Sequence, residues 1–511
     1  MTLARQMTLA TIGEKNARLM PDKVALVCGD TRVTHSELNR QANRMARVFS
    51  HMGIAKGDRV AILSRNCHRF IEVLFALSKL GAVLVPLNWR LKADELSYIA
   101  RDSDSRLLLW GEGFEQAAQE MAGQCAGDMQ TLDMASVYKE ASQEGVDDRD
   151  LSLEVYQDDI AVQMYTAAVE GQPRGAQITH GGYIAVATSV ALAFSLTDAD
   201  ANLVVVPLFH TFGLDQTVAV LFRGGKCVLV AEFDAAAASE IIERERVTWL
   251  SSAGPQLPEL VQELEKTPRD VGGLRIMMGD VGSKENMEAI RARAPGVRFF
   301  NAIYGQTECG MMATVCDAEQ AAGRGARCAG RAVAFSEVRI FTEDDIEVPP
   351  GQVGEIVVRG PRVMAGYYKL PEVNAEVLRG GWLRTGDLAT LDEDGYLYYV
   401  DRKRELIKSG MENVYPQEVE RVLATHPAVR EVSVIGIPDE QWGEAVTAIV
   451  ALKQDGAATA DDLIEFCKER IASYKKPKYV RFVDELPKDG TGQVLRDIVK
   501  AEHGYGLAPP A

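Results

Sequence analysis

The stretch DRVAILSRNCHRFIEVLFALSKLGAVLVPL, residues 58–87, decides the fold class of this chain. Its two ends, Asp58–Leu63 and Ala82–Leu87, are short apolar runs with the length of strands. Phe70–Leu80, between them, has the length and apolar content of a helix. A strand, a helix and a second strand in this order predict a largely parallel sheet that is flanked by helices.

The same alternation continues on both sides of this stretch. Val24–Cys28 is predicted as a strand, and Ser36–Met52 is predicted as a helix because its apolar residues recur at helical spacing. Lys92–Ala100 is predicted as the next helix. Further strands are predicted at Leu203–Pro207, Lys226–Val230 and Trp249–Ser251. We therefore expect an α/β fold over the first part of the chain.

The pattern changes after about residue 330. Val338–Phe341, Gly354–Arg359 and Tyr396–Val400 alternate in the way that antiparallel strands do, and turn residues separate them. A basic run follows at residues 401–404. Beyond it we predict a helix at Pro416–Thr425, strands at Glu431–Ile437 and Ala445–Leu452, and a helix at Ala460–Ile471. We place a domain boundary at 402–405, which gives domains of residues 1–402 and 403–511.

The composition excludes several classes of protein. The chain has 511 residues and a formal net charge of −17, so a nucleic-acid-binding surface is not expected. The N-terminal segment does not resemble a secretory signal, and the longest apolar runs are far shorter than a membrane span. Eight cysteines without a C-x-x-C pair favour reduced thiols over a disulfide framework or a zinc site. We expect a cytoplasmic globular protein, and a homodimer is compatible with the sequence.

Residues 303–308, IYGQTE, combine three side chains that suit a nucleotide. The ring of Tyr304 can stack on a base, the hydroxyl of Thr307 can bond a phosphate, and the carboxylate of Glu308 can hold Mg²⁺ as an oxygen ligand. Taken alone, the segment would be explained better as a buried strand end with one capping threonine.

Two further segments carry related chemistry. Residues 381–387, GWLRTGD, end in Asp387, whose carboxylate can accept hydrogen bonds from ribose hydroxyls. Arg402 could reach the same sugar, although a member of a solvated charge run is the plainer interpretation. Residues 207–213, PLFHTFG, place His210 among aromatic residues, a setting in which a histidine is usually packed in the core.

In their order and spacing these segments resemble the acyl-adenylate-forming superfamily, which comprises acyl-CoA synthetases, luciferases and the adenylation domains of peptide synthetases. The chain is similar to the fatty-acyl and aryl-CoA ligases, and the resemblance extends from about Thr11 to Lys500. It implies a large N-terminal domain of two α/β subdomains plus a distorted β-barrel, and a small mobile C-terminal α+β domain. It also implies ATP or AMP, CoA and Mg²⁺ as ligands, and a small carboxylic acid as the substrate.

The resemblance also assigns roles to individual residues. The catalytic positions are Thr307, Glu308, His210 and Gln493, with Glu308 as the metal ligand and His210 beside the channel for CoA. The nucleotide-binding positions are Thr166, Gly171, Arg174, Gly175, Tyr304, Gly305, Gln306, Asp387, Tyr399 and Arg402. The positions expected to bind the CoA nucleotide are Arg90, Trp442, Tyr474, Lys476 and Lys478, although an exposed basic patch explains the charged ones nearly as well. The hinge of the mobile domain falls at Arg404.

Two motifs depart from the family pattern. The phosphate loop, close to T-S-G-T-T-G-x-P-K-G in the family, is here TAAVEGQPRG, residues 166–175. Glu170 adds a negative charge that repels a phosphate charge at ~4 Å by roughly 4 kcal/mol. In residues 486–496, LPKDGTGQVLR, Gln493 replaces a lysine that bridges the carboxylate and the α-phosphate in the family. Losing one such donor typically costs about 10²–10³ in rate. A milder change is GDVG at residues 279–282, where the family has G-G-A-P.

These observations predict an acid:CoA ligase, an AMP-forming enzyme that activates a carboxylic acid as an acyl-adenylate and then passes the acyl group to CoA. The altered motifs predict that the ATP-dependent half-reaction is impaired. Two alternatives stay open. One is a non-catalytic homologue that binds AMP or acyl-CoA, and the other is an enzyme that performs only the thioester half-reaction. The sequence does not name the acid.

Overall fold

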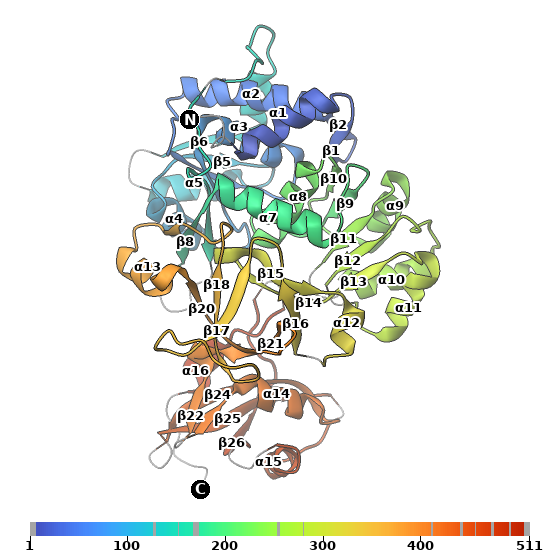
Figure 1. Cartoon of the computed structure of the whole chain (residues 1–511), viewed down its shortest axis with the longest axis vertical. Coiled ribbons are helices and arrows are strands. Elements are labelled where there is room, and N and C mark those ends of the chain that lie inside the picture. Colours follow the sequence, from blue (N-terminus) through green and yellow to red (C-terminus); the bar gives the residue numbers. More distant parts are fainter. Residues whose placement is uncertain are drawn as a thin grey trace. The chain divides into compact units, whose positions relative to one another are not determined.

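The chain forms two compact units in the computed structural model (Figure 1). The first unit comprises Met1–Val338 and Val358–Arg384, and the second comprises Arg339–Val357 and Thr385–Ala511. The structure describes residues 7–125, 129–151, 153–166, 173–252, 256–279, 281–325, 327–409, 412–439, 443–454, 456–471, 475–489 and 492–504.

One sheet of the first unit contains seven strands in the order β13-β12-β11-β9-β10-β1-β2. Its neighbouring strands are parallel, except for the antiparallel pair β1–β2 at one edge. The strands are β1 (Val24–Cys28), β2 (Thr31–Thr34), β9 (Ala201–Val204), β10 (Lys226–Leu229), β11 (Trp249–Ser251), β12 (Ile276–Met278) and β13 (Arg298–Phe300). The sequence analysis misses β2, because a strand with only Val33 buried has no apolar pattern.

The second sheet of this unit is built around residues 58–87 and has the order β19-β8-β7-β4-β3-β5-β6. Strand β3 (Arg59–Leu63), helix α3 (His68–Leu80) and strand β4 (Val83–Pro86) form the predicted unit, and β3 and β4 are parallel. Helix α3 ends at Gly81, whose φ of 71° favours glycine. The remaining strands are β5 (Ser105–Trp110), β6 (Gln130–Asp133), β7 (Ile160–Thr166), β8 (Arg174–Thr179) and β19 (Gly366–Tyr367).

The helices of the first unit pack on these two sheets. In Figure 1, helices α1, α2 and α3 lie side by side in the blue part of the chain. Helix α2 begins with a capping box, in which the Thr34 hydroxyl accepts from the Glu37 N–H and the Glu37 carboxylate accepts from the Thr34 N–H. Besides α3, the helices are α1 (Leu9–Leu19), α2 (His35–His51), α4 (Ala93–Asp102), α5 (Glu115–Gln124), α6 (Met134–Ala141), α7 (His180–Ala193), α8 (Thr211–Phe222), α9 (Ala235–Glu245), α10 (Gln256–Lys266), α11 (Lys284–Arg293), α12 (Ala318–Ala322) and α13 (Pro371–Val377).

In the first unit, three antiparallel strands come directly after β13 in the chain. They are β14 (Ala302–Gln306), β15 (Gly310–Cys316) and β16 (Cys328–Ala332). The 3-10 turn η2 (Thr307–Cys309) joins β14 to β15, so the IYGQTE segment becomes one strand and the turn that follows it. A second 3-10 turn, η3 (Arg379–Gly381), lies later in the chain.

The second unit starts with antiparallel strands. Strands β20 (Leu383–Leu391) and β21 (Tyr396–Arg402) pair directly, and the 3-10 turn η4 (Lys403–Glu405) follows them. The chain passes between the two units at three points, which lie within β17 (Glu337–Phe341), β18 (Gly354–Arg359) and β20. This division differs from the predicted boundary at 402–405, which stays a prediction together with the hinge.

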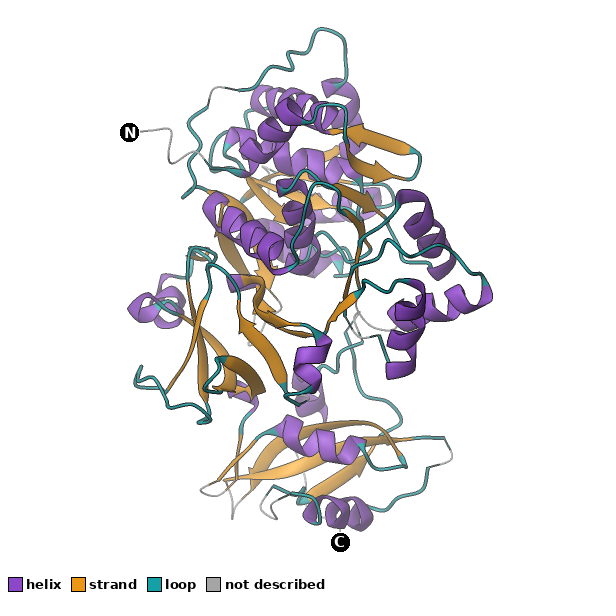
Figure 2. Cartoon of the chain, turned by 45° about the vertical axis from the view of Figure 1, so that its right-hand side comes forward, coloured by secondary structure: helices purple, strands orange, loops and turns teal. Residues whose placement is uncertain are grey.

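The C-terminal part of the second unit is a sheet covered by helices (Figure 2). Its strand order is β23-β22-β25-β24, and β26 also pairs with β25. Buried side chains of α14 and α15 share one core with those of β24 and β25. The elements are β22 (Ile407–Ser409), β23 (Glu412–Val414), α14 (Pro416–Ala424), β24 (Val429–Asp439), β25 (Gly443–Leu452), α15 (Ala460–Lys468), β26 (Tyr479–Phe482) and α16 (Arg496–His503).

The structure confirms the predicted fold class, a large α/β part that is followed by a smaller C-terminal α+β part. Most predicted elements agree with the observed ones to within two or three residues, because apolar periodicity locates buried elements well. Among the described residues, no helix is both long enough and apolar enough to cross a membrane.

Candidate active site

A cavity of about 630 Å³ lies in the first unit, where strands β12 and β13 end and helix α8 begins. Ligand sites of open α/β sheets usually lie at the carboxyl ends of parallel strands, which is the case here. The cavity is lined by His210, Thr211, Phe212, Met278, Gly279, Phe300, Asn301, Ile303, Gly305, Gln306, Thr307 and Met311. The predicted residues His210, Gly305, Gln306 and Thr307 are therefore brought together at one cavity.

The IYGQTE segment has its shape because two positions admit only glycine. A Cβ added at Gly305 would approach the carbonyl oxygen of Met311 to 2.5 Å. Gly310, which ends the turn, has a φ of 81°. The resulting turn places Thr307 on the cavity wall and buries the side chains of Tyr304 and Glu308.

Glu308 is held by contacts from the segment around strand β19. The Tyr367 hydroxyl donates to Glu308 Oε1 at 2.6 Å, and the Met364 N–H donates to the Glu308 carbonyl oxygen at 2.8 Å. Burial and the charge of Glu308 raise the pKa of Tyr367, so the phenol remains a donor at neutral pH. The sequence analysis misses Tyr367, because its partner lies 59 residues earlier in the chain.

The donor set around Glu308 suits a magnesium ion that arrives with a nucleotide. Magnesium is usually held by one or two carboxylates together with substrate phosphates and water. Within the described parts of the chain, no group of three or more His, Cys, Asp or Glu side chains could hold a metal ion by itself. The buried Glu308 carboxylate could serve as such a ligand, and its role stays a prediction.

The start of helix α8 contacts Thr307 from a second direction. The Thr211 hydroxyl lies 3.3 Å from the Thr307 hydroxyl, within hydrogen-bonding distance. His210 is the N-cap of this helix, and its Nδ1 accepts from the Phe212 N–H at 3.3 Å. Desolvation and the positive charge of Arg90 lower the pKa of His210, so its imidazole is neutral at pH 7. Its place on the cavity wall is compatible with the predicted position beside the channel for CoA.

A buried acid and a buried arginine support the turn that carries Glu308. Asp215 of α8 accepts from the Met311 N–H at 2.8 Å, and Arg362 Nε donates to the Cys309 carbonyl oxygen at 2.6 Å. Burial raises the pKa of Asp215 to about 7, although the Met311 N–H and the charge of Arg362 act in the opposite direction. The sequence analysis misses both residues, and a carboxylate within the apolar stretch of α8 is the signal that could have drawn attention to Asp215.

The two ends of the phosphate loop are fixed by strands β7 and β8. Thr166 lies opposite Arg174, and Tyr165 lies opposite Gly175. A Cβ at Gly175 would approach Gln163 Nε2 to 2.7 Å, so a larger residue here would displace the Gln163 side chain. The predicted residues Thr166, Arg174 and Gly175 are therefore close together. Gly171 and Glu170, with the rest of 167–172, lie outside the described residues.

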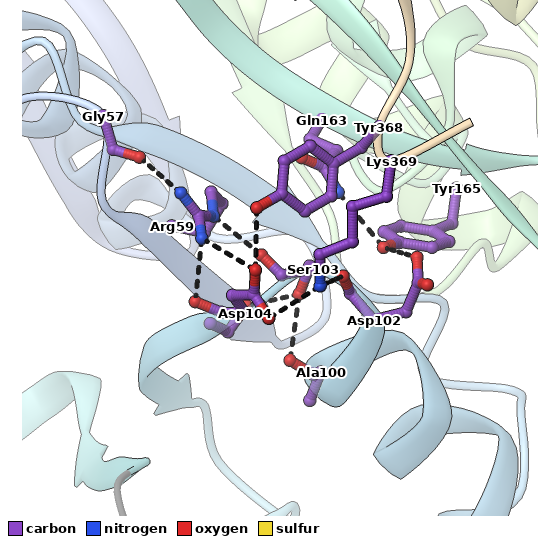
Figure 3. Close-up of polar contacts among 11 residues, drawn as sticks. Gly57, Arg59, Ala100, Asp102, Ser103, Asp104, Gln163, Tyr165, Tyr368 and Lys369 are labelled. Carbon is purple, nitrogen blue, oxygen red and sulfur yellow. Dashed lines mark hydrogen bonds and ion pairs between the residues drawn. The ribbon is translucent and has the colours of Figure 1, made fainter. Parts of the chain in front are cut away.

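A polar network anchors the first end of the loop to the turn after helix α4 (Figure 3). The Tyr165 hydroxyl donates to Asp102 Oδ2 at 2.6 Å and accepts from Gln163 Nε2 at 3.1 Å. In the same turn, Asp104 makes an ion pair with Arg59 at 3.4 Å. Burial and Asp102 raise the pKa of Tyr165, so it too remains a hydrogen-bond donor.

The predicted ribose residues lie together in the second unit. Asp387 of β20 is directly opposite Arg402 of β21, and Arg402 Nε lies 3.8 Å from Asp387 Oδ1. Burial and the Asp387 carboxylate raise the pKa of Tyr399, which is predicted more generally to bind the nucleotide. A partly buried carboxylate beside a guanidinium and a phenol suits the hydroxyls of a sugar.

Gln493 lies on an exposed turn of the second unit. Its N–H donates to Asp489 Oδ1 at 3.0 Å, and its side chain is exposed. Lys488, the nearest lysine along this motif, forms an ion pair with Glu431. Lys488 is therefore engaged by a carboxylate of strand β24. Arg404 belongs to the η4 turn, and its role as the hinge stays a prediction.

The residues predicted to bind the CoA nucleotide are divided between the units. In the first unit, the Arg90 guanidinium lies 5.0 Å from the ring centre of Trp89 and 5.9 Å from that of Phe209. In the second unit, Lys478 Nζ pairs with Asp439 at 2.7 Å, and Lys476 is half-buried. Trp442 and Tyr474 lie outside the described residues.

Comparison with known proteins places this site among nucleotide-dependent enzymes. Residues 13–368 match the model of the AMP-binding enzyme family, and residues 418–493 match that of the AMP-binding enzyme C-terminal domain. Feruloyl-CoA synthase of an Amycolatopsis species is 36% identical over 495 residues, which cover 96% of this chain and 98% of that protein.

Solved structures show the same likeness over nearly the whole chain. The fatty acyl CoA synthetase of Mycobacterium tuberculosis superposes with a TM-score of 0.82 at 31% identity, covering 98% of each chain. The O-succinylbenzoate coenzyme A synthetase of Bacillus subtilis, in complex with ATP and a magnesium ion, gives a TM-score of 0.83 at 33% identity. That comparison covers 96% of this chain and 99% of the synthetase.

Proposed function

This chain belongs to the AMP-binding enzyme family, and from that premise we propose that it is an acid:CoA ligase for a monocarboxylic acid with an apolar tail. In the first half-reaction, a carboxylate oxygen of the acid attacks the α-phosphorus of ATP, and pyrophosphate leaves. In the second, the thiolate of CoA attacks the acyl carbonyl carbon, and AMP leaves with the electron pair of the broken C–O bond. The products are acyl-CoA, AMP and pyrophosphate.

One observation carries this proposal, namely that Thr307 forms part of the cavity wall beside the start of helix α8. An acid whose tail fills the cavity would present its carboxylate next to a phosphate bonded by the Thr307 hydroxyl. Holding two reactants in this way replaces an encounter in solution by a reaction within one complex. His210, on the same wall, would line the path of the thiolate.

The other predicted residues would hold the nucleotide. Tyr304, Gly305 and Gln306 would contact the adenine, while Asp387 and Arg402 would bind the ribose. Glu308 would hold Mg²⁺, and a magnesium ion bound with ATP neutralises part of the charge on the phosphates. Arg90 and the lysines of the second unit would bind the phosphates of CoA.

The cavity lining supports an acid with an apolar tail. Five of the twelve described residues that line the cavity have aromatic, thioether or branched aliphatic side chains, namely Phe212, Met278, Phe300, Ile303 and Met311. Burying an aryl ring or an alkyl chain against them stabilises the complex by about 25 cal/mol per Å² of apolar surface.

The same lining disfavours a second carboxylate on the tail. The described wall contains no lysine or arginine, and the pKa of His210 is lowered, so the imidazole is neutral. An unpaired charge inside such a cavity is costly. The Asn301 amide offers neutral hydrogen bonds that suit a hydroxyl or an ether on the tail.

We further propose that the ATP-dependent half-reaction is slow relative to thioester formation. Gln493 supplies a neutral amide where the family has a lysine, and Glu170 adds a negative charge to the phosphate loop. Both changes affect the triphosphate and the carboxylate of the acid, whereas the ribose and α-phosphate residues are retained.

ATP–pyrophosphate exchange with a panel of acids tests the proposal. We expect exchange with aromatic or alkyl monocarboxylic acids, ferulic acid among them, at rates at least roughly tenfold above those with the dicarboxylic acid 2-succinylbenzoate. A synthetic acyl-AMP mixed with CoA should give acyl-CoA faster than acid, ATP and CoA do. A preference for the dicarboxylic acid would contradict the proposed substrate class. Absence of both half-reactions with every acid would instead indicate a non-catalytic homologue.

A further inference from the structure

Two consecutive tyrosines, the last residue of β19 and the residue after it, donate hydrogen bonds to carboxylates in two different places. The Tyr367 hydroxyl donates to the buried Glu308 at 2.6 Å, and the Tyr368 hydroxyl donates to the exposed Asp104 at 2.7 Å. Figure 3 shows Tyr368 at Asp104, where the Lys369 ammonium also binds at 2.7 Å. Because successive residues of an extended strand point to opposite sides, only one of the two tyrosines faces the site.

The backbone of Tyr367 is clamped on both of its polar groups. Its N–H donates to Asn374 Oδ1 at 2.7 Å, and its carbonyl oxygen accepts from Asn374 Nδ2 at 2.8 Å. Gly366, just before it, has a φ of 144°, and a Cβ there would approach the Asn374 amide nitrogen to 2.9 Å. Strand β8 pairs with this segment, with Ala176 opposite Tyr367. The direction in which the phenol points is therefore set by the backbone.

The position of Tyr367 also connects two motifs of the site. Its ring centre lies 5.7 Å from the guanidinium of Arg174, which stands in the phosphate loop where the family has lysine. Its hydroxyl reaches Glu308 in the turn after β14. The backbone N–H of Tyr368 adds a hydrogen bond to the Gly175 carbonyl oxygen at 2.8 Å. Tyr367 thus contacts both Arg174, at the described end of the phosphate loop, and the Glu308 carboxylate, which is expected to face the metal.

We propose that Tyr367 is a positioning residue, which orients the Glu308 carboxylate toward the magnesium ion of bound Mg·ATP. The proposal rests on the proposed function, because it assigns Tyr367 to the same nucleotide site. A phenol that donates to Oε1 restricts rotation of the carboxylate and leaves its charge in place. Partners of this kind typically change metal affinity or activity 10–100-fold when they are removed.

The consecutive tyrosines provide a matched pair of variants. Tyr367→Phe removes the hydroxyl at the site and keeps the ring, whereas Tyr368→Phe removes the same group from a bond to an exposed carboxylate. For each variant we would measure Mn²⁺ binding in the presence of ATP by electron paramagnetic resonance, and ATP binding in EDTA by calorimetry. Formation of acyl-CoA from synthetic acyl-AMP and CoA, together with the melting temperature, reports on the rest of the protein.

We expect Tyr367→Phe to weaken Mn²⁺ binding by roughly 10–100-fold and to leave ATP binding in EDTA and the acyl-AMP reaction unchanged. Tyr368→Phe should match the wild type in all of these measurements. Equal weakening of Mn²⁺ binding in the two variants would overturn the inference. So would an equal loss, in Tyr367→Phe, of Mn²⁺ binding, ATP binding in EDTA and the acyl-AMP reaction, because that result would show a structural role.

The experiment separates this inference from the proposed function. Normal Mn²⁺ binding by the wild type, together with unchanged binding by Tyr367→Phe, would overturn the inference alone. No Mn²⁺ binding by the wild type in the presence of ATP would overturn the assignment of Glu308 and, with it, the role of Tyr367.

Discussion

The turn that carries Glu308 and the turn that carries Gln493 differ in burial and in the hydrogen bonds that hold them. Glu308 is buried, and Tyr367 and Met364 donate to its carboxylate and to its carbonyl oxygen. Asp215 holds the chain just after the turn by accepting from the Met311 N–H. Gln493 is exposed on its turn, and its N–H donates to Asp489, four residues earlier. The long-range contacts of its motif come from other residues, since Lys488 pairs with Glu431 and Arg496 pairs with Glu420.

This difference suggests a division of labour between the two units. A residue that must face a metal ion and phosphates benefits from a fixed orientation, because preorganised groups need not rearrange during the reaction. The family resemblance implies that the C-terminal domain, residues 403–511, is mobile, so a residue on its exposed turn would serve one half-reaction and leave the site in the other. The four predictions below test this division, from the largest expected effect to the smallest.

Removing the charge at the fixed turn should have the largest effect. We expect Glu308→Gln to lower ATP–pyrophosphate exchange by roughly 10²–10³-fold, because a preorganised charge is lost from the nucleotide site. Stopped-flow or exchange assays with the best acid measure this change. Asp104→Asn, which removes an exposed carboxylate that also accepts from a tyrosine, should have little effect. An equal loss in the acyl-AMP plus CoA reaction would contradict a role restricted to adenylation.

Restoring a cation at the exposed turn should have the next largest effect. We expect Gln493→Lys to raise the rate of acyl-CoA formation from acid, ATP and CoA by roughly 10–100-fold, since it returns a charged donor to the first half-reaction. The rate from acyl-AMP and CoA should not change. Gln352→Lys adds the same charge at another exposed turn of the same unit and serves as the control. Adenylation by the wild type at ordinary enzyme rates, of order 1–10³ s⁻¹, would show that the replacement is compensated elsewhere.

The phosphate loop should discriminate between nucleotides by a smaller factor. We expect AMP to bind at least as tightly as ATP at matched Mg²⁺, because Glu170 repels the outer phosphates while the ribose and α-phosphate residues are retained. Glu170→Thr should strengthen ATP binding by roughly tenfold and leave AMP binding unchanged. Isothermal calorimetry measures both nucleotides. A wild-type protein that prefers ATP clearly over AMP would remove the argument from this loop.

A change at Asp215, which helps to hold the turn that carries Glu308, should have the smallest effect, and that effect is on stability. The pKa of Asp215 is raised to about 7 from an ordinary value near 3.8, so this group favours the folded state most at pH values below 4. That contribution decreases as the pH rises toward 7, by at most ~1.4 kcal/mol per pH unit. Asp215→Asn keeps an acceptor for the Met311 N–H and should remove this slope. Melting temperatures between pH 5 and 7.5 should differ in slope between the two proteins by roughly 2 °C per pH unit. If the melting temperatures of the wild type and Asp215→Asn changed equally with pH, the raised pKa of Asp215 would be contradicted.

Local patterns in the sequence predicted many of the helices and strands. Residues 58–87 predicted β3, α3 and β4 because the apolar runs are long and Gly81 ends the helix. The IYGQTE segment predicted that Thr307 and Glu308 act together, and the cavity lies at Thr307. By contrast, β2 has too few apolar residues to be recognised, and its pairing with β1 appears only in the folded sheet.

The sequence by itself determined the α/β fold, the membership of the family and the identity of the altered positions, because these depend on residue type and order along the chain. Only the tertiary structure decided what holds Glu308. Tyr367 and Glu308 are 59 residues apart, and Asp215 and Met311 are 96 apart. No periodicity or motif links such positions. They meet because β19 pairs with β8 and because α8 lies against β15, and those contacts arise from packing of the whole unit.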